Sequence, residues 1–235
     1  MSFSSEWDRR YQQQTHLSIW PWSELVGYVM RHARPSGRDF RVLELGCGAG
    51  ANIPFFQSLE VDYCAIEGSS AIVEKLWQRF PELSAKIVAS DFTMAIPFSG
   101  QFDLIVDRSS LTHNTTEAIA RCIGLVHARL KPGGKFIGID WFSTVCSEFQ
   151  RGLPGGDAYT RTGYLDGSFA DVGRVHFSDK AHLQTLFKDF ELTQLEHKTI
   201  VRAFPDDGWQ IASWNFITTK PGSIPVSATI TSLEP

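Results

Sequence analysis

A chain of 235 residues is long enough for one large domain, and 43% hydrophobic residues can build a full core. Its 22 basic and 26 acidic residues give a net charge of −4 without a long basic run. This argues against nucleic acid as the main partner, because neutralising phosphates requires clustered lysine and arginine. We find no secretory signal and no apolar run near the ~18 residues of a membrane span, so we expect a cytoplasmic protein with no membrane partner.

The four cysteines, Cys47, Cys64, Cys122 and Cys146, are widely spaced and contain no Cys-x-x-Cys pair. That spacing disfavours both a disulfide framework and a cysteine-ligated metal site. We expect free thiols in a reducing compartment and no bound metal. The sequence carries no signal for an oligomeric state.

Residues 1–34 are expected to form an N-terminal cap and a first helix over 23–33. Aromatic residues gather ahead of that helix, at Trp7, Tyr11, Trp20 and Trp22. Aromatic side chains in such a position either pack on the core or cover a ligand, and both alternatives stand at this point.

Between residues 41 and 140, strand-like runs alternate with amphipathic helical segments. Ser69 or Ser70 is the expected N-cap of one helix, Thr115 or Thr116 that of another, and residues 131–134 (KPGG) predict a turn. Near-continuous apolar strands separated by such helices indicate a parallel sheet covered on both faces, and therefore an α/β, doubly wound fold. The predicted strands are 41–45, 61–67, 86–91, 102–107 and 135–141.

The last third of the chain departs from this rhythm. Residues 143–177 are rich in glycine and aromatic side chains with weak periodicity, and we expect a lid-like insertion after the fifth strand rather than a packed layer. Ser178 is the expected cap of a following helix. Two strand-like runs, 191–204 and 209–220, are joined by a Pro-Asp-Asp-Gly turn and should pair antiparallel. Residues 1–220 are taken as one domain and 221–235 as a tail.

The segment VLELGCGAGAN, residues 42–52, is a strand that runs into a glycine-rich turn. Its glycines fit two patterns: Gly46-x-Gly48-x-x-Ala51 matches a dinucleotide fingerprint, and Gly46-x-Gly48-x-Gly50 does not. In open α/β sheets, ligands bind beyond the carboxyl ends of the strands. Glu67 lies 21 residues after Gly46 and can accept two hydrogen bonds from a ribose diol, in a dinucleotide or in another adenosine-containing ligand.

Charge distinguishes a dinucleotide from another adenosine-containing ligand. Glu44, two residues before the first glycine, would repel a pyrophosphate and would suit an ammonium or sulfonium group. The alternative is that Glu44 only anchors the loop. Asp91 followed by Phe92 fits an adenine, whose exocyclic amine donates to a carboxylate, although Asp91 can also cap a turn. A cationic, adenosine-containing ligand without phosphates describes S-adenosylmethionine.

Five segments together carry a family resemblance from about Arg41 to Lys220. They are VLELGCGAG, CAIEGS, VASDF, FDLIVDRSSLTH and LKPGGKFIGID. In this order and spacing the chain resembles the class I, Rossmann-like S-adenosylmethionine-dependent methyltransferases of small-molecule type. The resemblance implies a mostly parallel seven-stranded sheet with an antiparallel last strand and helices on both faces.

The resemblance also implies a cofactor site that binds S-adenosylmethionine and releases S-adenosylhomocysteine. It implies that the glycine loop contacts the methionine end of the cofactor, that Glu67 binds the ribose hydroxyls and that Asp107 lies near the methionine amino group. The segment around Trp7 and Tyr11 resembles an element that closes over the cofactor in related enzymes. The candidate cofactor contacts are Glu44, Gly46, Cys47, Gly48, Asn52, Glu67, Gly68, Asp91, Phe92, Asp107, Trp7 and Tyr11.

Methyl transfer from a sulfonium is an in-line displacement that depends mainly on alignment and electrostatics, so a base is needed only when the acceptor must lose a proton. His113 is the candidate general base, with a loop hydrogen bond as its alternative role. Arg108 would hold a substrate or cofactor carboxylate, or else pair with Asp107 or Asp140. Many family members have Asn or Ser at the position of Arg108, so this loop departs from the usual pattern. Insertion residues that can face the acceptor are Tyr159, Arg161, Tyr164, Asp166, Asp171, Arg174 and His176.

The sequence therefore predicts a methyltransferase that acts on a small-molecule acceptor, with no nucleic-acid partner. Two alternatives remain open at this stage. One is an NAD(P)-dependent Rossmann oxidoreductase, against which Glu44 and the terminal strand pair argue. The other is a protein that binds S-adenosylmethionine without catalysis.

Overall fold

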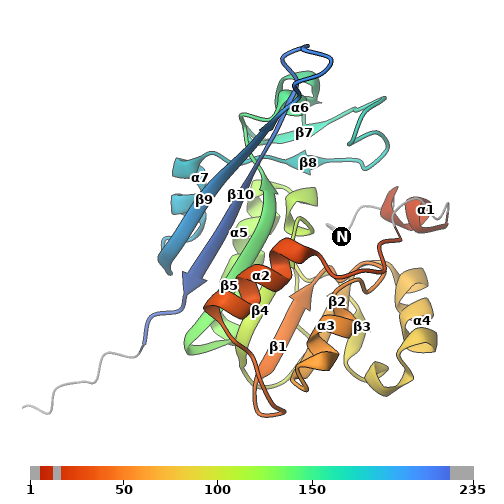
Figure 1. Cartoon of the computed structure of the whole chain (residues 1–235), viewed down its shortest axis with the longest axis vertical. Helices are drawn as coiled ribbons and strands as arrows, with labels where there is room; N and C mark the ends of the chain where they lie inside the picture. Colours follow the sequence, from red (N-terminus) through yellow and green to blue (C-terminus); the bar gives the residue numbers. More distant parts are fainter. Residues whose placement is uncertain (1–5, 13–16, 223–235) are drawn as a thin grey trace, which may run out of the picture.

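The computed structural model describes residues 6–12 and 17–222. Its main feature is a seven-stranded sheet of order β3-β2-β1-β4-β5-β10-β9 (Figure 1). Strand β10 runs antiparallel to both of its neighbours, and the β1–β2, β2–β3, β1–β4 and β4–β5 pairs are parallel. The predicted mostly parallel sheet with an antiparallel last strand is therefore confirmed. The strands are β1 (Arg41–Leu45), β2 (Asp62–Glu67), β3 (Ile87–Ala89), β4 (Phe102–Arg108), β5 (Leu130–Phe142), β9 (Glu191–Val201) and β10 (Gln210–Thr219).

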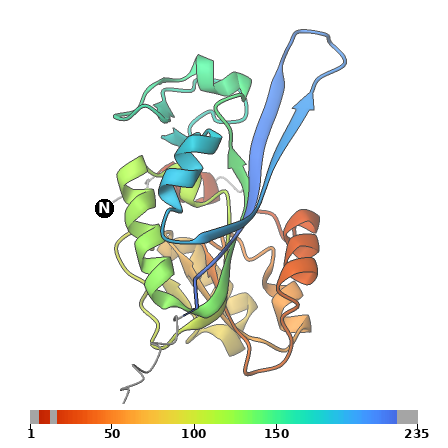
Figure 2. The same ribbon diagram turned by 90° about the vertical axis from the view of Figure 1, so that its left-hand side faces the viewer.

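Helices cover both faces of this sheet, as the edge-on view of Figure 2 shows. One face carries α2 (Ser23–His32), α3 (Ile53–Ser58) and α4 (Ser70–Arg79), and the other carries α5 (Thr116–Arg129) and α7 (Lys180–Leu186). Two separate apolar clusters fill these layers, because β1, β2 and β4 send buried apolar side chains to both faces. Short 3₁₀ turns occur at η1 (Pro81–Leu83) and η2 (Leu111–His113).

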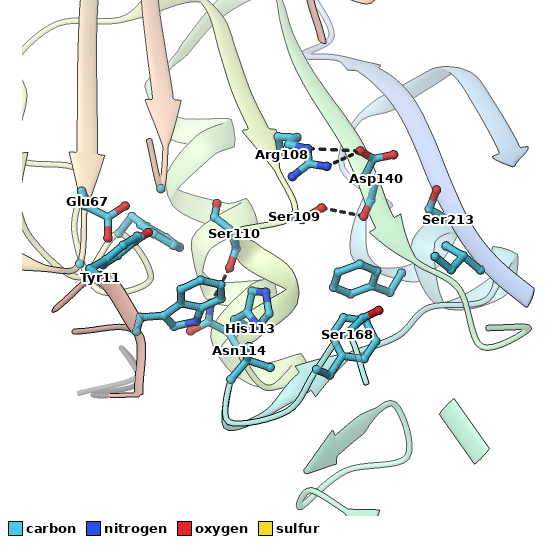
Figure 3. Close-up of a pocket in the computed structure, with 18 of the residues that line it drawn as sticks. Tyr11, Glu67, Arg108, Ser109, Ser110, His113, Asn114, Asp140, Ser168 and Ser213 are labelled. Carbon is cyan, nitrogen blue, oxygen red and sulfur yellow. Dashed lines mark hydrogen bonds and ion pairs between the residues drawn. The ribbon is translucent and has the colours of Figure 1, made fainter. Parts of the chain in front are cut away.

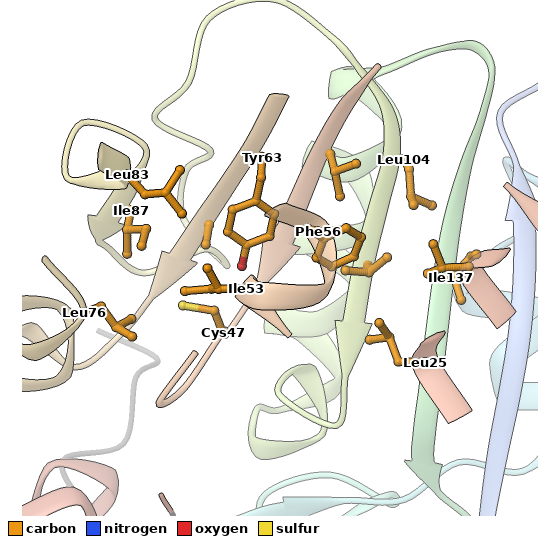
Figure 4. Packing of buried hydrophobic residues seen from close by; sticks show 14 of the residues in the cluster. Leu25, Cys47, Ile53, Phe56, Tyr63, Leu76, Leu83, Ile87, Leu104 and Ile137 are labelled. Atoms are coloured by element: carbon orange, nitrogen blue, oxygen red, sulfur yellow. The ribbon is translucent and has the colours of Figure 1, made fainter. Parts of the chain in front are cut away.

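The cluster under α2, α3 and α4 is built around large side chains that exclude solvent almost completely (Figure 4). The rings of Phe56 in α3 and Tyr63 in β2 stack with centroids 5.2 Å apart. Leu25 of α2 and Ile137 of β5 belong to the same cluster. A single apolar layer thus ties the helix before the sheet to the strands that end at the candidate site.

The helix starts follow the predicted capping with one difference. Ser69 accepts a hydrogen bond from the backbone N–H of Ile72 (3.3 Å), and Thr115 accepts one from Ala118 (3.4 Å). The prediction that Ser178 caps the next helix is wrong, because Asp179 takes that role. Backbone hydrogen bonds to Phe142 and Thr144 hold Ser178 in an extended bridge beside β5, so the helix begins later.

The fifth strand begins at Leu130, earlier than its predicted start at 135. Leu130 pairs with Phe102, and Lys135 pairs with Leu104, so residues 131–134 form an irregularity within the strand. Gly133 has a positive φ of 77° there, which a glycine adopts without strain. The predicted turn exists, but it interrupts a strand that pairs with β4 on both sides of it.

Residues 143–177 contain more regular structure than their weak periodicity predicts. They form α6 (Ser147–Arg151) and a three-stranded antiparallel sheet of β6 (Leu153–Pro154), β7 (Thr160–Thr162) and β8 (Val175–His176). A third apolar cluster that includes Tyr164, Phe169 and Phe177 supports this insertion. The insertion lies at the end of the molecule where the β9–β10 hairpin extends beyond the main sheet (Figure 1).

The short helix α1 (Glu6–Gln12) lies beside the carboxyl ends of β1 and β2 (Figure 1). The expected tail, 221–235, falls almost entirely on residues 223–235, outside the described part of the chain. No helix within the described ranges has the length and apolarity to cross a membrane.

Packing at the β5–β10 junction gives a stability prediction. A Cβ atom at Gly138 would lie 2.2 Å from Cζ of the buried Phe216, its cross-strand partner. Gly138→Ala should therefore lower the free energy of unfolding by about 1–3 kcal/mol. Gly124 in α5 has no atom within 4 Å of its Cβ position, so Gly124→Ala should stabilise by about 0.5–1 kcal/mol. Urea denaturation that finds the same sign for both variants would contradict this packing.

Candidate functional site

A cavity of about 500 Å³ opens beyond the carboxyl ends of the parallel strands, where open α/β sheets bind ligands (Figure 3). One half borders the glycine loop and the ends of β2 and β3, and is called the glycine-loop half. The other borders β5, the insertion and the β9–β10 hairpin, and is called the hairpin half. The lining residues are Trp7, Tyr11, Gly46, Glu67, Gly68, Ser90, Asp91, Phe92, Arg108, Ser109, Ser110, His113, Asn114, Asp140, Phe142, Ser168, Phe169, Val172, Lys198, Ile200, Ile211 and Ser213.

The glycine loop brings bare backbone to the cavity. Gly46 has φ 64°, and a Cβ atom there would lie 2.2 Å from Cβ of Ser110, so a larger residue would displace the next loop. Its N–H donates to the carbonyl oxygen of Ile66 (2.8 Å), which fixes the loop against β2. Gly50 has φ 79° and packs under α4, where a Cβ atom would lie 2.6 Å from Leu76. Gly46 is thus the loop residue that lines the cavity.

Glu67 ends β2 and lines the cavity, although only 4% of its surface is exposed. One carboxylate oxygen accepts from the N–H of Gly48 (2.8 Å) and the other accepts from the N–H of Ser69 (3.1 Å). The side chain therefore joins the glycine loop to the start of α4 and holds its carboxylate at the cavity wall. Gly68 follows it in the lining.

Asp91 and Phe92, which follow Ser90 at the end of β3, also line the cavity. Asp91 Oδ1 accepts from the backbone N–H (2.9 Å) and the hydroxyl (2.7 Å) of Thr93, so the turn role considered for Asp91 is present in the structure. The same turn directs the pair of residues to the cavity. A carboxylate and an aromatic edge thus occur side by side at this wall.

Trp7 and Tyr11 of α1 line the glycine-loop half of the cavity, and Figure 3 shows Tyr11 beside Glu67. Their ring centroids are 5.9 Å apart, and the Trp7 ring meets the His113 ring edge-on at 4.7 Å. An aromatic pair from a segment ahead of the first strand therefore borders the same space as Glu67.

Five expected cofactor contacts, Glu44, Cys47, Gly48, Asn52 and Asp107, are not in this lining. Glu44 is buried beneath the loop, where it accepts from Asn52 Nδ2 (2.8 Å) and from the Tyr63 hydroxyl (2.5 Å). Burial raises the pKa of this carboxyl group above its ordinary value. The Asn52 side chain also accepts from the N–H of Trp22 (3.1 Å), so Glu44 and Asn52 anchor the loop to the chain ahead of the sheet.

Asp107, the residue before the last of β4, is a fully buried carboxylate. It accepts from Trp141 Nε1 (2.6 Å), from the N–H of Leu111 (3.1 Å) and from the Ser110 hydroxyl. Burial raises its pKa to about 6, against the lowering effect of these hydrogen bonds. Asp107 therefore positions the loop that carries Ser110 and His113 rather than lining the cavity itself.

Arg108 and His113, the two candidate catalytic residues, both line the cavity. Arg108 pairs with Asp140 (Nη2 to Oδ2, 2.9 Å) and lies over the Trp22 ring at 3.5 Å, so the ion pair considered for it is confirmed. His113 is partly buried, and its Nδ1 lies 3.3 Å from the carbonyl oxygen of Arg174. That contact joins the loop after β4 to the insertion.

Sequence reasoning missed the hairpin wall. Lys198 and Ile200 of β9 lie opposite Ser213 and Ile211 of β10, and all four line the cavity. Residues two apart on a strand share a face, so the alternation was visible, but which face meets the cavity depends on how far the hairpin extends. The insertion contributes Ser168, Phe169 and Val172, whereas its expected polar residues Tyr159, Arg161, Tyr164, Asp166, Asp171, Arg174 and His176 lie outside the lining.

A comparison of this chain with known protein families agrees with this geometry. Residues 42–134 match the family model described as a methyltransferase domain. The chain contains a class I S-adenosylmethionine-dependent methyltransferase domain. It is accordingly an S-adenosylmethionine-dependent methyltransferase, and the oxidoreductase alternative is set aside. No curated protein sequence matches the chain.

Solved structures with this fold include several methyltransferases. An S-adenosylmethionine-dependent methyltransferase from Methanosarcina mazei is 16% identical, with TM-score 0.65 over 87% of this chain and 100% of that one. The 1,6-didemethyltoxoflavin-N1-methyltransferase of Burkholderia thailandensis is 17% identical, with TM-score 0.61 over 92% of this chain and 84% of that one. The geranyl diphosphate C-methyltransferase of Streptomyces coelicolor is 13% identical, with TM-score 0.60 over 84% of this chain and 79% of that one. At these identities the likeness concerns the fold.

The buried carboxyl of Asp107 gives a prediction about pH. Because folding raises its pKa to about 6 from the ordinary 3.8, the folded state binds more protons than the unfolded state between these values. The contribution of this group to stability therefore falls as the pH rises through that range. Relative to the wild type, Asp107→Asn should gain roughly 2–3 kcal/mol of stability between about pH 4 and about pH 7. Parallel stability profiles in urea would contradict the assignment, and Asp39→Asn, at an exposed position, controls for the loss of one carboxyl.

Proposed function

We propose that this methyltransferase acts on a small molecule bound in the hairpin half of the cavity. The observation that carries the proposal is the extension of the cavity beyond the glycine-loop half, into a space walled by Phe142, Phe169, Val172, Ile200 and Ile211. A volume of about 500 Å³ lies within the usual range for small-molecule sites. Two enzymes of similar fold act on 1,6-didemethyltoxoflavin and on geranyl diphosphate, which supports an acceptor of this size.

In this proposal the cofactor occupies the glycine-loop half. Glu67 accepts from the ribose hydroxyls, and Asp91 with Phe92 borders the adenine. Gly46 offers its backbone to the methionine end, while Trp7 and Tyr11 cover the cofactor. Glu44, Asn52 and Asp107 act beneath this site by holding its loops. The backbone N–H groups of Cys47 and Gly48 hold the same loop against Ile66 and Glu67.

The proposed reaction is an in-line displacement. The bond between sulfur and the methyl group breaks, a bond from the methyl group to the acceptor forms, and neutral S-adenosylhomocysteine leaves. The loops that carry His113 and Arg108 align the acceptor with the cofactor and exclude water. Where the acceptor atom carries a proton, His113 is the group placed to accept it.

We further propose that residues 143–177 cover the bound acceptor. The insertion has its own apolar cluster, contributes Phe169 and Val172 to the cavity, and contacts His113 through the carbonyl of Arg174. A cover of this kind replaces water around the reacting atoms.

The proposed function is tested by incubating the protein with an extract of small metabolites and S-adenosylmethionine that carries an isotopically labelled methyl group. We expect a labelled product of low molecular mass, identified by mass spectrometry. Label found only on protein or nucleic acid in an unfractionated extract would contradict a small-molecule acceptor. Cofactor binding without any transfer would favour a binding protein that lacks catalysis.

The ribose assignment predicts the effect of one substitution. Glu67→Ala should weaken S-adenosylhomocysteine binding by roughly 1–3 kcal/mol, the scale of hydrogen bonds to a charged group. Glu74→Ala, at an exposed position of α4, is the matched control and should bind as the wild type does. Isothermal titration calorimetry measures both, and an unchanged affinity for Glu67→Ala would remove this residue from the ribose site.

The proton-accepting role of His113 predicts a loss of rate without a loss of cofactor binding. His113→Ala should lower turnover of the labelled reaction by about 10²–10⁴-fold, with S-adenosylhomocysteine affinity retained. A near-normal rate would leave His113 with its loop contact to Arg174 as its role.

If the insertion covers the acceptor, ligand binding should protect it. Hydrogen exchange across residues 143–177 should slow on addition of S-adenosylhomocysteine together with the identified acceptor. Exchange that is unchanged in this segment, while the glycine loop becomes protected, would describe a rigid wall instead of a lid.

A further inference from the structure

Two cations in the hairpin half of the cavity share a single carboxylate. Arg108 donates to Asp140 Oδ2 from Nε (3.2 Å) and Nη2 (2.9 Å), and Lys198 donates from Nζ to Asp140 Oδ1 (2.7 Å) (Figure 3 shows the Arg108 pair). All three residues line the cavity. Lys198 also pairs with Glu24 of α2, which lies outside the lining.

Arg108 and Lys198 together have more N–H donors than Asp140 can accept. A guanidinium has five N–H donors and an ammonium has three. Arg108 Nη1 donates to no acceptor in the described part of the chain, and Lys198 has one N–H beyond those it gives to Asp140 and Glu24. Asp140 already receives two donors on Oδ2 and one on Oδ1. The N–H donors of Arg108 and Lys198 that have no protein partner therefore outnumber the acceptor sites that remain on Asp140.

The backbone of Asp140 is held in place beside these cations. It has a positive φ of 58°, an uncommon conformation for a residue other than glycine. Its N–H donates to Asn215 Oδ1 (2.8 Å) and its carbonyl oxygen accepts from the Ser109 hydroxyl (2.8 Å). The Arg108 guanidinium is likewise fixed on the other side by the Trp22 ring. The cations are therefore held in place before any acceptor arrives.

The walls around these cations are largely apolar, apart from serine side chains such as Ser213, which lies opposite Lys198. Ile200 and Ile211 are cross-strand neighbours on the hairpin, and the rings of Phe142 and Phe169 meet at 4.7 Å. An acceptor that fills this space displaces the water that solvates the unused donors. Leaving charged donors dry is costly, so the acceptor must itself supply oxygen atoms to them.

We propose that the methyl acceptor is a small, largely apolar molecule with an anionic oxygen group that binds between Arg108 and Lys198. This inference rests on the proposed function and names its substrate class. Ion pairing with two cations lowers the nucleophilicity of the anionic oxygens, so the methyl group goes to another atom of the acceptor and the product keeps its acid. Asp140 competes with the acceptor for the same donors and thereby limits its affinity.

The test uses matched probes, since no acceptor is needed to measure anion recognition. A series of phenylalkanoates, from phenylacetate to 6-phenylhexanoate, and the corresponding amides are titrated by calorimetry into protein saturated with S-adenosylhomocysteine. We expect at least one acid to bind roughly tenfold or more tightly than its amide, the scale of a hydrogen bond to a charged group. If no acid in the series binds better than its amide, the proposal is wrong.

Variants of opposite expected sign separate recognition from folding defects. Lys198→Met should remove most of the preference for the acid, and Asp140→Asn should increase it, because the competing charge is gone. Lys75→Met, at an exposed position of α4, is the matched control and should match the wild type. A general loss of structure would weaken acid and amide alike and would not produce the tighter binding expected of Asp140→Asn. If Asp140→Asn does not increase the preference for the acid over its amide, Asp140 does not compete with the acceptor for these donors.

The labelled-methyl assay supplies an independent reading. A labelled product that retains an acidic group supports the proposal, and a neutral or cationic product overturns it while leaving the methyltransferase function intact. If S-adenosylhomocysteine does not bind and no label is transferred, the proposed function fails instead.

Discussion

The buried carboxylate of Asp107 is the interaction on which the rest of the site depends. It lies at the end of β4, in the middle of the sheet, and it joins Trp141 of β5 to the loop that starts at Ser110. The hydroxyl oxygen of Ser110 also lies 2.8 Å from the carbonyl oxygen of Leu45, the residue that precedes the glycine loop. One desolvated acid thus fixes the relative positions of β1, β4 and β5 at the edge where the cavity opens, at the cost of a raised pKa.

Much of the fold could be predicted because it depends on local pattern. The apolar run 41–45 became β1 with the same bounds, and the caps at Ser69 and Thr115 lie where polar side chains precede amphipathic helices. The insertion was harder to predict, since its strands are only two or three residues long and pair with one another over a small core. Periodicity cannot reveal strands of that length. The cap at Asp179 was missed because a bridge to β5, far away in the sequence, decides where Ser178 lies.

The candidate site divides in the same way. Glu67, Asp91 and Phe92 follow parallel strands, so topology alone brings them to one cavity wall. Glu44 drew attention by its charge, yet the fold buries it, where it supports the loop through Asn52 and Tyr63. The hairpin wall depends on long-range register, which sequence pattern does not determine. This division has a physical consequence: the half that is set by topology suits a cofactor shared by many enzymes, and the half that is set by register and insertion suits one acceptor.

We propose that an adenosine cofactor lies along the glycine-loop half with its methionine end directed to the hairpin half. A crystal structure of the protein with S-adenosylhomocysteine tests this most directly. We expect the adenine beside Asp91 and Phe92, the ribose hydroxyls within hydrogen-bonding distance of Glu67, and the amino-acid end over Gly46. S-adenosylhomocysteine bound in the reverse direction, or outside this cavity, would contradict it.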